Sequence, residues 1–256
     1  MNLKEELTNI TTGYAAETIR TRLLVKFVES SAKKKAEETI EMHSTIQKLL
    51  SGELAHKKKH PQDRSTIEVP TKLLIDLASP LEKTGKDLLS LPELCLRMAY
   101  VHLVTLFEAA LSDIIRTTLT YKPNILKSKR QISYEDVLSE PDMTSLLLKI
   151  IDKEISDMTY GSTEETIDYL QNKLHLPVTF SDEEHLELET IKAQRNLLVH
   201  NQGKIDAKYL KKKISGDFSL GDNIIITEKD WDAANLLFGG IINSLELAII
   251  RKFKLT

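Results

Sequence analysis

The chain has 256 residues, of which 41% are hydrophobic and 29% charged, and its 35 Lys and Arg against 38 Asp and Glu give a formal net charge of -3. Only 9 Gly and 7 Pro occur, too few for the turns of a many-stranded sandwich or barrel, so an all-β fold is close to excluded. The near-neutral charge also argues against a protein that coats nucleic acid non-specifically, because such binding requires an excess of cationic groups to release counterions.

The compartment and the metal content follow from equally simple observations. No apolar run approaches the roughly 20 residues of a membrane span, and the polar N-terminus, MNLKEELTNI, has no signal-peptide core. We therefore expect a cytoplasmic protein without a membrane partner. The single cysteine, Cys95, excludes an intrachain disulfide, and its apolar surroundings predict a small buried residue. Because the histidines are scattered and no cysteine pair supports them, we expect neither a metal nor a cofactor.

The N-terminal part is predicted to be helical. From Thr11 to Lys59, apolar residues recur among Lys and Glu with almost no breakers, which indicates one or two long amphipathic helices. The segment HKKKHPQDRSTIEVP, residues 56–70, concentrates charge and two prolines, so we expect a loop or a short extended excursion there. His56 and His60 are four residues apart, but a metal site is disfavoured because no third ligand is near.

A second helical region is expected after residue 70, with a break at Pro80 and a restart at Ser90. Ser90 opens a Ser-x-x-Glu capping box with Pro92 in its first turn. The helix that follows, about 92–120, is apolar on nearly all sides, which predicts a position at the centre of a bundle. His102 on this helix is expected to be a hydrogen-bonded core histidine.

Three shorter helices are expected next, with N-caps at Ser133, Ser162 and Ser181, each followed three residues later by an acidic residue. The third of them ends near Gly203, in the position of a left-handed C-cap. A short β-prone stretch, 223–226, then precedes a long apolar helix that begins after an N-cap at Thr227 and extends to about Lys252.

Together these elements predict an all-α fold, a helical bundle with at most a minor β excursion. We expect two regions. Residues 1–70 form an N-terminal helical extension or dimerisation element, and residues 71–256 form the bundle itself.

One segment departs from routine helical patterning. Arg195, Asn196 and His200 form R-N-x-x-x-H at the end of a predicted helix. At about 100° per residue, Asn196 and His200 are about 40° apart on one face, whereas Arg195 points about 140° away from His200. Arg195 projects from an apolar row, where an unpaired guanidinium would cost several kcal/mol. It therefore requires a carboxylate, a phosphate or a surface cleft.

The segment RNLLVHN, residues 195–201, resembles the signature of the HEPN superfamily, in which an arginine is followed after four to six residues by a histidine. In that signature a polar residue often comes directly after the arginine. The segment YVHLVTLFEAALSDII, residues 100–115, is similar to the earlier core helix of this family, with Glu108 as the acidic residue in apolar surroundings. The resemblance covers about residues 90–250.

This resemblance implies a metal-independent endoribonuclease of a bacterial toxin–antitoxin or anti-phage defence system. Its partners would be RNA, a second copy of the chain in a homodimer whose motif helices face one cleft, and an antitoxin or other defence protein. His200 would be the general base or general acid, because histidine exchanges protons near neutral pH. Arg195 would hold the phosphoryl oxygens, Asn196 would orient the imidazole or the phosphate, and Glu108 and Asn201 would support them.

Other interpretations stay open beside this one. Arg195 can instead pair with a core acid such as Glu108, while His200 only stabilises a helix C-terminus. A HEPN-like fold can also be kept without catalysis, as an interaction or assembly module. The lysine runs at 33–35, 57–59 and 211–213 could form an RNA-binding surface, although solvated faces and loops are the commoner explanation.

Overall fold

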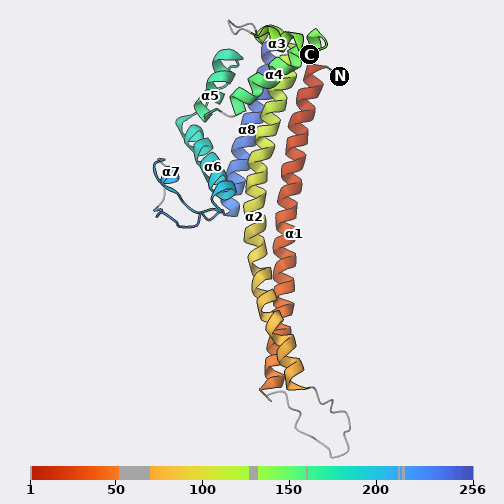
Figure 1. Cartoon of the computed structure of the whole chain (residues 1–256), viewed down its shortest axis with the longest axis vertical. Helices are drawn as coiled ribbons and strands as arrows, with labels where there is room; N and C mark the ends of the chain where they lie inside the picture. Colours follow the sequence, from red (N-terminus) through yellow and green to blue (C-terminus); the bar gives the residue numbers. More distant parts are fainter. Residues whose placement is uncertain are drawn as a thin grey trace, which may run out of the picture. The chain divides into compact units, whose positions relative to one another are not determined.

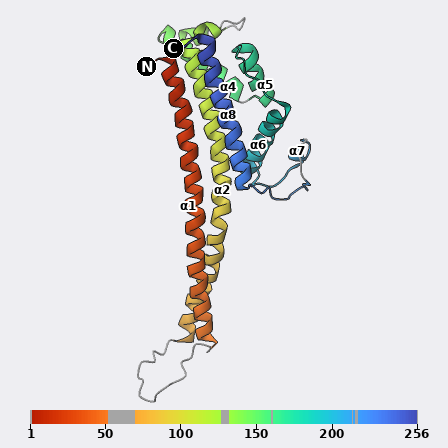
Figure 2. The ribbon, with the colours of Figure 1, turned by 180° about the vertical axis from the view of Figure 1, so that it is seen from behind.

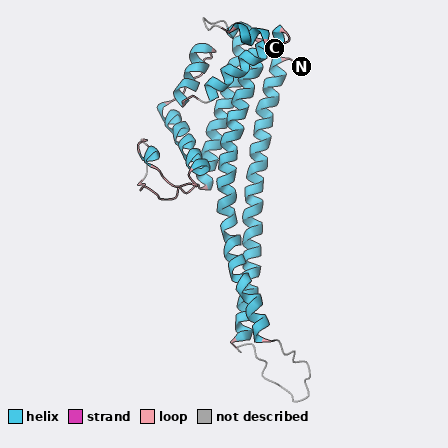
Figure 3. Ribbon diagram, viewed as in Figure 1, coloured by secondary structure: helices cyan, strands magenta, loops and turns pink. Residues whose placement is uncertain are grey.

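The computed structural model describes residues 2–51, 70–126, 132–159, 161–212, 214 and 217–255. The described residues are 81% helical, and they contain an isolated antiparallel bridge between Lys204 and Asn223 but no strand (Figure 3). The predicted all-α helical bundle is thereby confirmed. The elements are α1 (Leu3–Leu50), α2 (Thr71–Tyr121), the 3-10 helix η1 (Pro123–Leu126), α3 (Tyr134–Leu138), α4 (Met143–Thr159), α5 (Thr163–Asp168), the π-helical turn η2 (Tyr169–Lys173), α6 (Asp182–His200), α7 (Ala207–Leu210) and α8 (Glu228–Phe253).

The two long helices are each continuous. Helix α2 runs without interruption through Pro80 and Pro92, so the predicted break and restart are wrong. Each proline removes one N–H donor from the helix, a cost that packing against another helix can offset. Ser90 does not cap a new helix; its hydroxyl donates to the backbone oxygen of Asp87 at 2.7 Å.

The chain forms two compact units, residues 22–96 and residues 1–21 together with 97–256. Both long helices contribute to both units, so the units do not follow the boundary expected at residue 70. The division into 1–70 and 71–256 stays a prediction. The excursion expected at 56–70, with His56 and His60, lies outside the described residues except for its last residue.

The unit of residues 22–96 is an antiparallel pair of helices whose seam is made of small side chains (Figure 1). Ala32 and Ala36 of α1 and Ala78 of α2 are buried there. A Cβ at Gly85 would lie 3.1 Å from Cγ1 of Ile40, so glycine permits the close approach of the two helices. Large apolar residues of α1 are left exposed, notably Leu23 (63%), Leu24 (57%) and Phe27 (68%).

The other unit has its core between α2 and α8, which lie side by side in both views (Figures 1 and 2). The rings of Phe107 and Phe238 stack at 4.1 Å with an interplanar angle of 6°, and the indole N–H of Trp231 donates to the Ala99 oxygen at 3.4 Å. The expected burial of α2 on all sides is not observed. His102 is exposed, and Cys95, in the unit of residues 22–96, is only half-buried.

Helices α2 and α8 are both long and apolar enough to cross a membrane by length and composition alone. The sequence-based statement that no stretch is long enough is therefore wrong. Buried residues of these helices, such as Leu103 and Phe238, belong to the core of their unit, and core helices of soluble proteins meet the same criterion. The predictions of a cytoplasmic location and of no membrane partner stay predictions.

The local signals for the shorter helices are confirmed. Ser133, Ser162, Ser181 and Thr227 each accept a hydrogen bond from the backbone N–H three residues on, and the last three form full capping boxes. Helices α4 and α7 are additional elements, each preceded by an aspartate whose carboxylate accepts a backbone N–H. The β-prone stretch at 223–226 forms a single bridge and no strand.

Candidate active site on the R-N-x-x-x-H helix

Helix α6 carries the motif, and its C-terminal end is held against α2. After His200 the chain turns through Gly203, whose φ of +82 and N–H bond to the Leu197 oxygen at 2.9 Å confirm the predicted left-handed cap. The Arg97 guanidinium of α2 donates to the Gln202 oxygen at 3.0 Å. A Cβ at Gly203 would lie 2.7 Å from Nη2 of Arg97. Glycine therefore lets the turn and the arginine approach closely.

One face of α6 lines an open groove of about 660 Å³. Residues at intervals of three and four along a helix share a face, and Glu189, Lys192, Asn196 and His200 follow that spacing. The segment after the motif forms another wall, with α7 at its centre. The full lining is Gly161, Ser162, Glu189, Lys192, Ala193, Asn196, Leu197, His200, Asn201, Asp206, Lys208, Tyr209 and Lys212.

Arg195 does not line this groove, in keeping with its direction on the helix. Its Nη2 lies 3.3 Å from Oε2 of Glu108, and the two side chains are 27% and 31% exposed. Its Nη1 donates to Oδ1 of Asn196 at 3.0 Å. The Nε of Arg195 is buried and has no hydrogen-bond partner among the described residues. The structure thus brings Arg195, Glu108 and Asn196 together, and the pairing of Arg195 with Glu108 is confirmed.

Asn196 and His200 are both exposed on the groove side of α6. Asn196 connects the two halves of the motif, because its amide oxygen is bound to Arg195 while the residue lines the same groove as His200. Asn201 also lines the groove, and its amide donates to the Lys204 oxygen at 2.6 Å. Asn201 therefore holds the turn that follows the motif.

The charges of the groove are mixed, but its carboxylates are engaged. Glu189 lies 2.5 Å from the Lys212 ammonium and also accepts a hydrogen bond from the Thr163 hydroxyl. Burial raises the pKa of Glu189, but the hydrogen bonds from Lys212 and Thr163 outweigh it and hold the pKa below its ordinary value. Asp206 accepts the N–H of Tyr209 at the start of α7. Lys192 and Lys208 also line the groove. Their positive charges suit it to an anionic ligand.

Two groove lysines were not predicted as site residues. Lys192 lies four residues before Asn196 and eight before His200, so helical spacing alone could have placed it on the same face. Lys208 offers no such signal, because its place depends on how the segment after Gly203 folds back. Two backbone hydrogen bonds hold that segment. The N–H of Ile205 donates to the Asp222 oxygen, and the N–H of Ile224 donates to the Gly203 oxygen. Within the described ranges, no three His, Cys, Asp or Glu side chains gather as a metal site.

No family model matches the chain, and no curated protein or solved structure matches it. The resemblance to the HEPN superfamily therefore depends on the residues of the motif helix and of the segment 100–115.

Proposed function

We propose that the protein is a metal-independent endoribonuclease of the HEPN type, belonging to a bacterial toxin–antitoxin or anti-phage defence system. One observation carries the proposal: the exposed His200 lies with Asn196 in a groove that also holds Lys192, Lys208 and Lys212. A proton-transfer group and ammonium groups that line one groove match the needs of an anionic phosphodiester. The proposed assembly is a homodimer in which the two motif helices face one cleft.

In the proposed reaction the 2′-hydroxyl of RNA attacks the adjacent phosphorus. The O2′–P bond forms and the P–O5′ bond breaks, which leaves a 2′,3′-cyclic phosphate and a 5′-hydroxyl. His200 takes the proton of the attacking hydroxyl or gives one to the departing 5′ oxygen. The lysines offset the charge that develops on the phosphoryl oxygens. This chemistry requires no metal.

The contacts of Arg195 modify the role that the family resemblance implies for it. Its guanidinium is bound to Glu108 and Asn196, so we assign it to positioning. It fixes Asn196 on the face of α6 that also carries His200, while the groove lysines meet the phosphate.

The test is RNA cleavage in the presence of EDTA, with end-group analysis of the products. The wild type should cut RNA, and His200→Ala should lose activity by about 100-fold or more, the usual contribution of a general acid or base. His102→Ala is the matched control, because His102 is exposed but does not line the groove. Equal rates for His200→Ala and wild type, or no cleavage of any RNA tried, would contradict the catalytic proposal. Inhibition by EDTA would contradict the metal-free mechanism.

A second candidate is a non-catalytic helical assembly module. The Arg195–Glu108 pair favours it, since the pair explains the arginine without a substrate, and so do the exposed apolar residues of α1, such as Leu23 and Phe27. This candidate predicts that Arg195→Ala changes the melting temperature or the oligomeric state while the wild type cuts no RNA. Light scattering and thermal unfolding distinguish the two candidates.

A further inference from the structure

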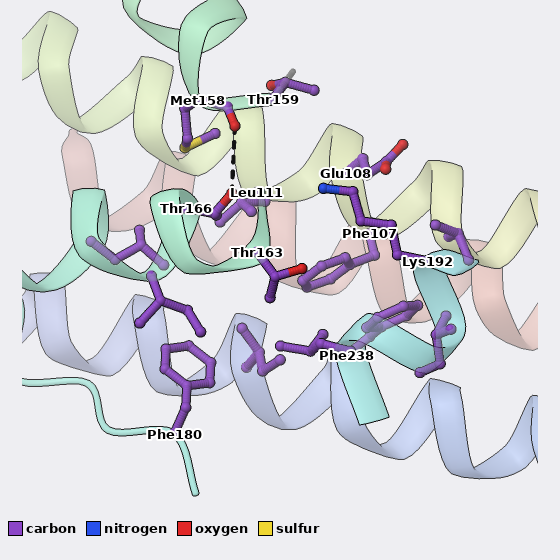
Figure 4. A pocket seen from close by; sticks show the side chains of 16 residues that line it. Phe107, Glu108, Leu111, Met158, Thr159, Thr163, Thr166, Phe180, Lys192 and Phe238 are labelled. Atoms are coloured by element: carbon purple, nitrogen blue, oxygen red, sulfur yellow. Dashed lines mark hydrogen bonds between the residues drawn. The ribbon is translucent and has the colours of Figure 1, made fainter. Parts of the chain in front are cut away.

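The two units of the chain differ in how far they bury their large apolar side chains. In the unit of residues 1–21 and 97–256, aromatic rings of Phe107, Phe180 and Phe238 line a cavity of only about 80 Å³ (Figure 4). In the unit of residues 22–96, Val25 and Leu96 are the large apolar residues that are buried among those described. This helix pair therefore leaves most of its large apolar side chains in water.

The seam between α1 and α2 separates two broad faces of the helix pair. Buried or half-buried residues mark the seam at intervals of three and four, for example Val25, Val28 and Ala32 on α1 and Leu81, Gly85 and Leu88 on α2. Residues one position before a seam residue lie to one side of the seam, and residues one position after it lie to the other. Because the two helices are antiparallel, the preceding positions of both helices share one broad face.

This shared face, which we call the apolar face, collects exposed apolar side chains from both helices. On α1 they are Leu24 (57%), Phe27 (68%), Met42 (57%) and Leu49 (48%). On α2 they are Leu73 (50%), Leu77 (50%), Leu91 (40%) and Leu94 (51%). The opposite broad face is charged instead, with Glu29, Lys33 and Glu37 on α1 and Glu82, Lys86 and Glu93 on α2. The helix pair is thus amphipathic as a whole.

The apolar face is large enough for a stable interface. From Leu24 to Leu49 it runs about 38 Å at 1.5 Å per residue, and two packed helices are together about 20 Å wide. Its area is therefore about 700–800 Å², close to the roughly 800 Å² that each partner contributes to a stable complex. Exposed apolar residues gathered on one face of this size mark an interaction site.

The order of residues on α1 indicates which partner fits. Leu24 and Leu49 lie at equal distances from the midpoint between Ala36 and Glu37, and so do Lys35 and Glu38. Two copies of α1 packed antiparallel about that midpoint would bring each Leu24 onto Leu49 of the second copy. Each Lys35 would lie beside Glu38 of the second copy. Both residues are accessible for this contact, since their side chains are 68% and 50% exposed and are paired with each other at 3.1 Å.

We propose that the apolar face is an interface between two copies of this chain. In it α1 packs antiparallel against α1 of the second copy, and the two helix pairs together form a four-helix bundle. Such an interface is isologous, so the same surface must complement itself. Apolar ends that meet apolar ends, with opposite charges at the centre, meet that requirement. The proposal does not rest on the proposed function, because the groove lies in the other unit.

The test is sedimentation of the full chain over a range of concentrations. We expect the wild type to form a dimer. Leu24→Glu should raise its dissociation constant 100-fold or more, because the carboxylate would be buried without a partner against Leu49 of the second copy. Leu89→Glu is the matched control, since Leu89 is 53% exposed and lies three residues after Lys86 on the charged face. It should leave the dissociation constant unchanged.

A charge exchange at exposed residues tests the antiparallel register without depending on an apolar position. Lys35→Glu places two carboxylates opposite each other, so it should raise the dissociation constant about tenfold. Adding Glu38→Lys restores opposite charges across the interface and should return the constant to within about threefold of the wild type. A double variant as weak as Lys35→Glu would overturn the proposed pairing of α1 with α1.

The remaining outcomes separate this interface from the proposed function. A wild type that stays monomeric would overturn the proposal and leave the apolar face to a different protein. A dimer that Leu24→Glu leaves intact would also overturn it, because a dimer held by the motif helices would behave in this way. A dimer that Leu24→Glu dissociates, in a protein that cuts no RNA, would support this interface and reject the ribonuclease.

Discussion

The ion pair between Arg195 and Glu108 decides whether the motif arginine is held by the fold or is free to meet a substrate. Replacing Glu108 with Gln removes the charge and keeps the shape of the side chain, and Arg195→Gln removes its partner. The two single variants and the double variant form a thermodynamic cycle. The coupling energy of this cycle isolates the interaction from the other effects of each substitution.

The geometry sets the expected size of the coupling. Two unit charges 3.3 Å apart interact by about 5 kcal/mol at an effective dielectric of about 20, but by only about 1 kcal/mol in bulk water. Both side chains are roughly 30% exposed, so desolvation and ordering of the side chains offset part of that attraction. We expect a coupling of about 1–2 kcal/mol, above that of exposed pairs and below the cost of leaving a buried charge unpaired.

The assay is equilibrium unfolding in urea of wild type, Glu108→Gln, Arg195→Gln and the double variant. A parallel cycle on Lys86 and Glu82, which are paired at 2.7 Å on the surface of α2, should give a smaller coupling that salt weakens further. A coupling of the Arg195–Glu108 cycle below about 0.3 kcal/mol, within the additivity error of independent sites, would refute the reasoning. Arg195 would then be free for the phosphate, as the family resemblance implies.

Two further predictions concern helix α2 and the groove. Pro92→Ala restores a helical N–H inside a continuous helix, so it should raise the free energy of unfolding by about 1–3 kcal/mol. Pro123→Ala, at the first residue of η1, is the control. An unchanged urea midpoint for Pro92→Ala would contradict the continuous helix and favour one that restarts at Ser90. Lys212 holds the pKa of Glu189 in the folded state below its ordinary value. The folded state should therefore lose stability as the pH falls from about 4.3, the pKa of glutamate in the unfolded chain, through the lower pKa of Glu189 in the folded state. Glu189→Gln should flatten that loss in acid unfolding curves, and an unchanged curve would contradict the pair.

Features that depend on a few adjacent residues were predictable from the sequence. The N-caps at Ser162, Ser181 and Thr227 follow from local hydrogen bonding between a side chain and the backbone three residues on. The left-handed conformation of Gly203 is likewise local. The relative directions of Asn196, His200 and Arg195 required only helical geometry, and the structure places them accordingly.

Features that depend on distant segments were not predictable in the same way. The continuity of α2 through Pro80 and Pro92 reflects packing of its seam against α1, which local breaker signals do not contain. His102 is exposed for a similar reason, because an apolar helix keeps one face free when its neighbours cover only the others. The pair of Arg195 and Glu108 is an exception among the distant contacts: it was offered as an alternative from the sequence, because a charge in apolar surroundings needs an opposite charge.

The groove also explains how a chain of net charge -3 can offer a site for an anion. What matters for such a site is the charge of the groove that remains after its side chains have paired with one another. Glu189 is neutralised by Lys212 and shares its lone pairs with Thr163, while Asp206 is bound to the backbone at the start of α7. Among the described residues, the Lys192 ammonium donates to the neutral carbonyl of Gly161, and Lys192 lines the same groove as His200. The low overall charge disfavours non-specific coating of RNA, and in the proposed function the local excess of lysines would hold one phosphate at one place.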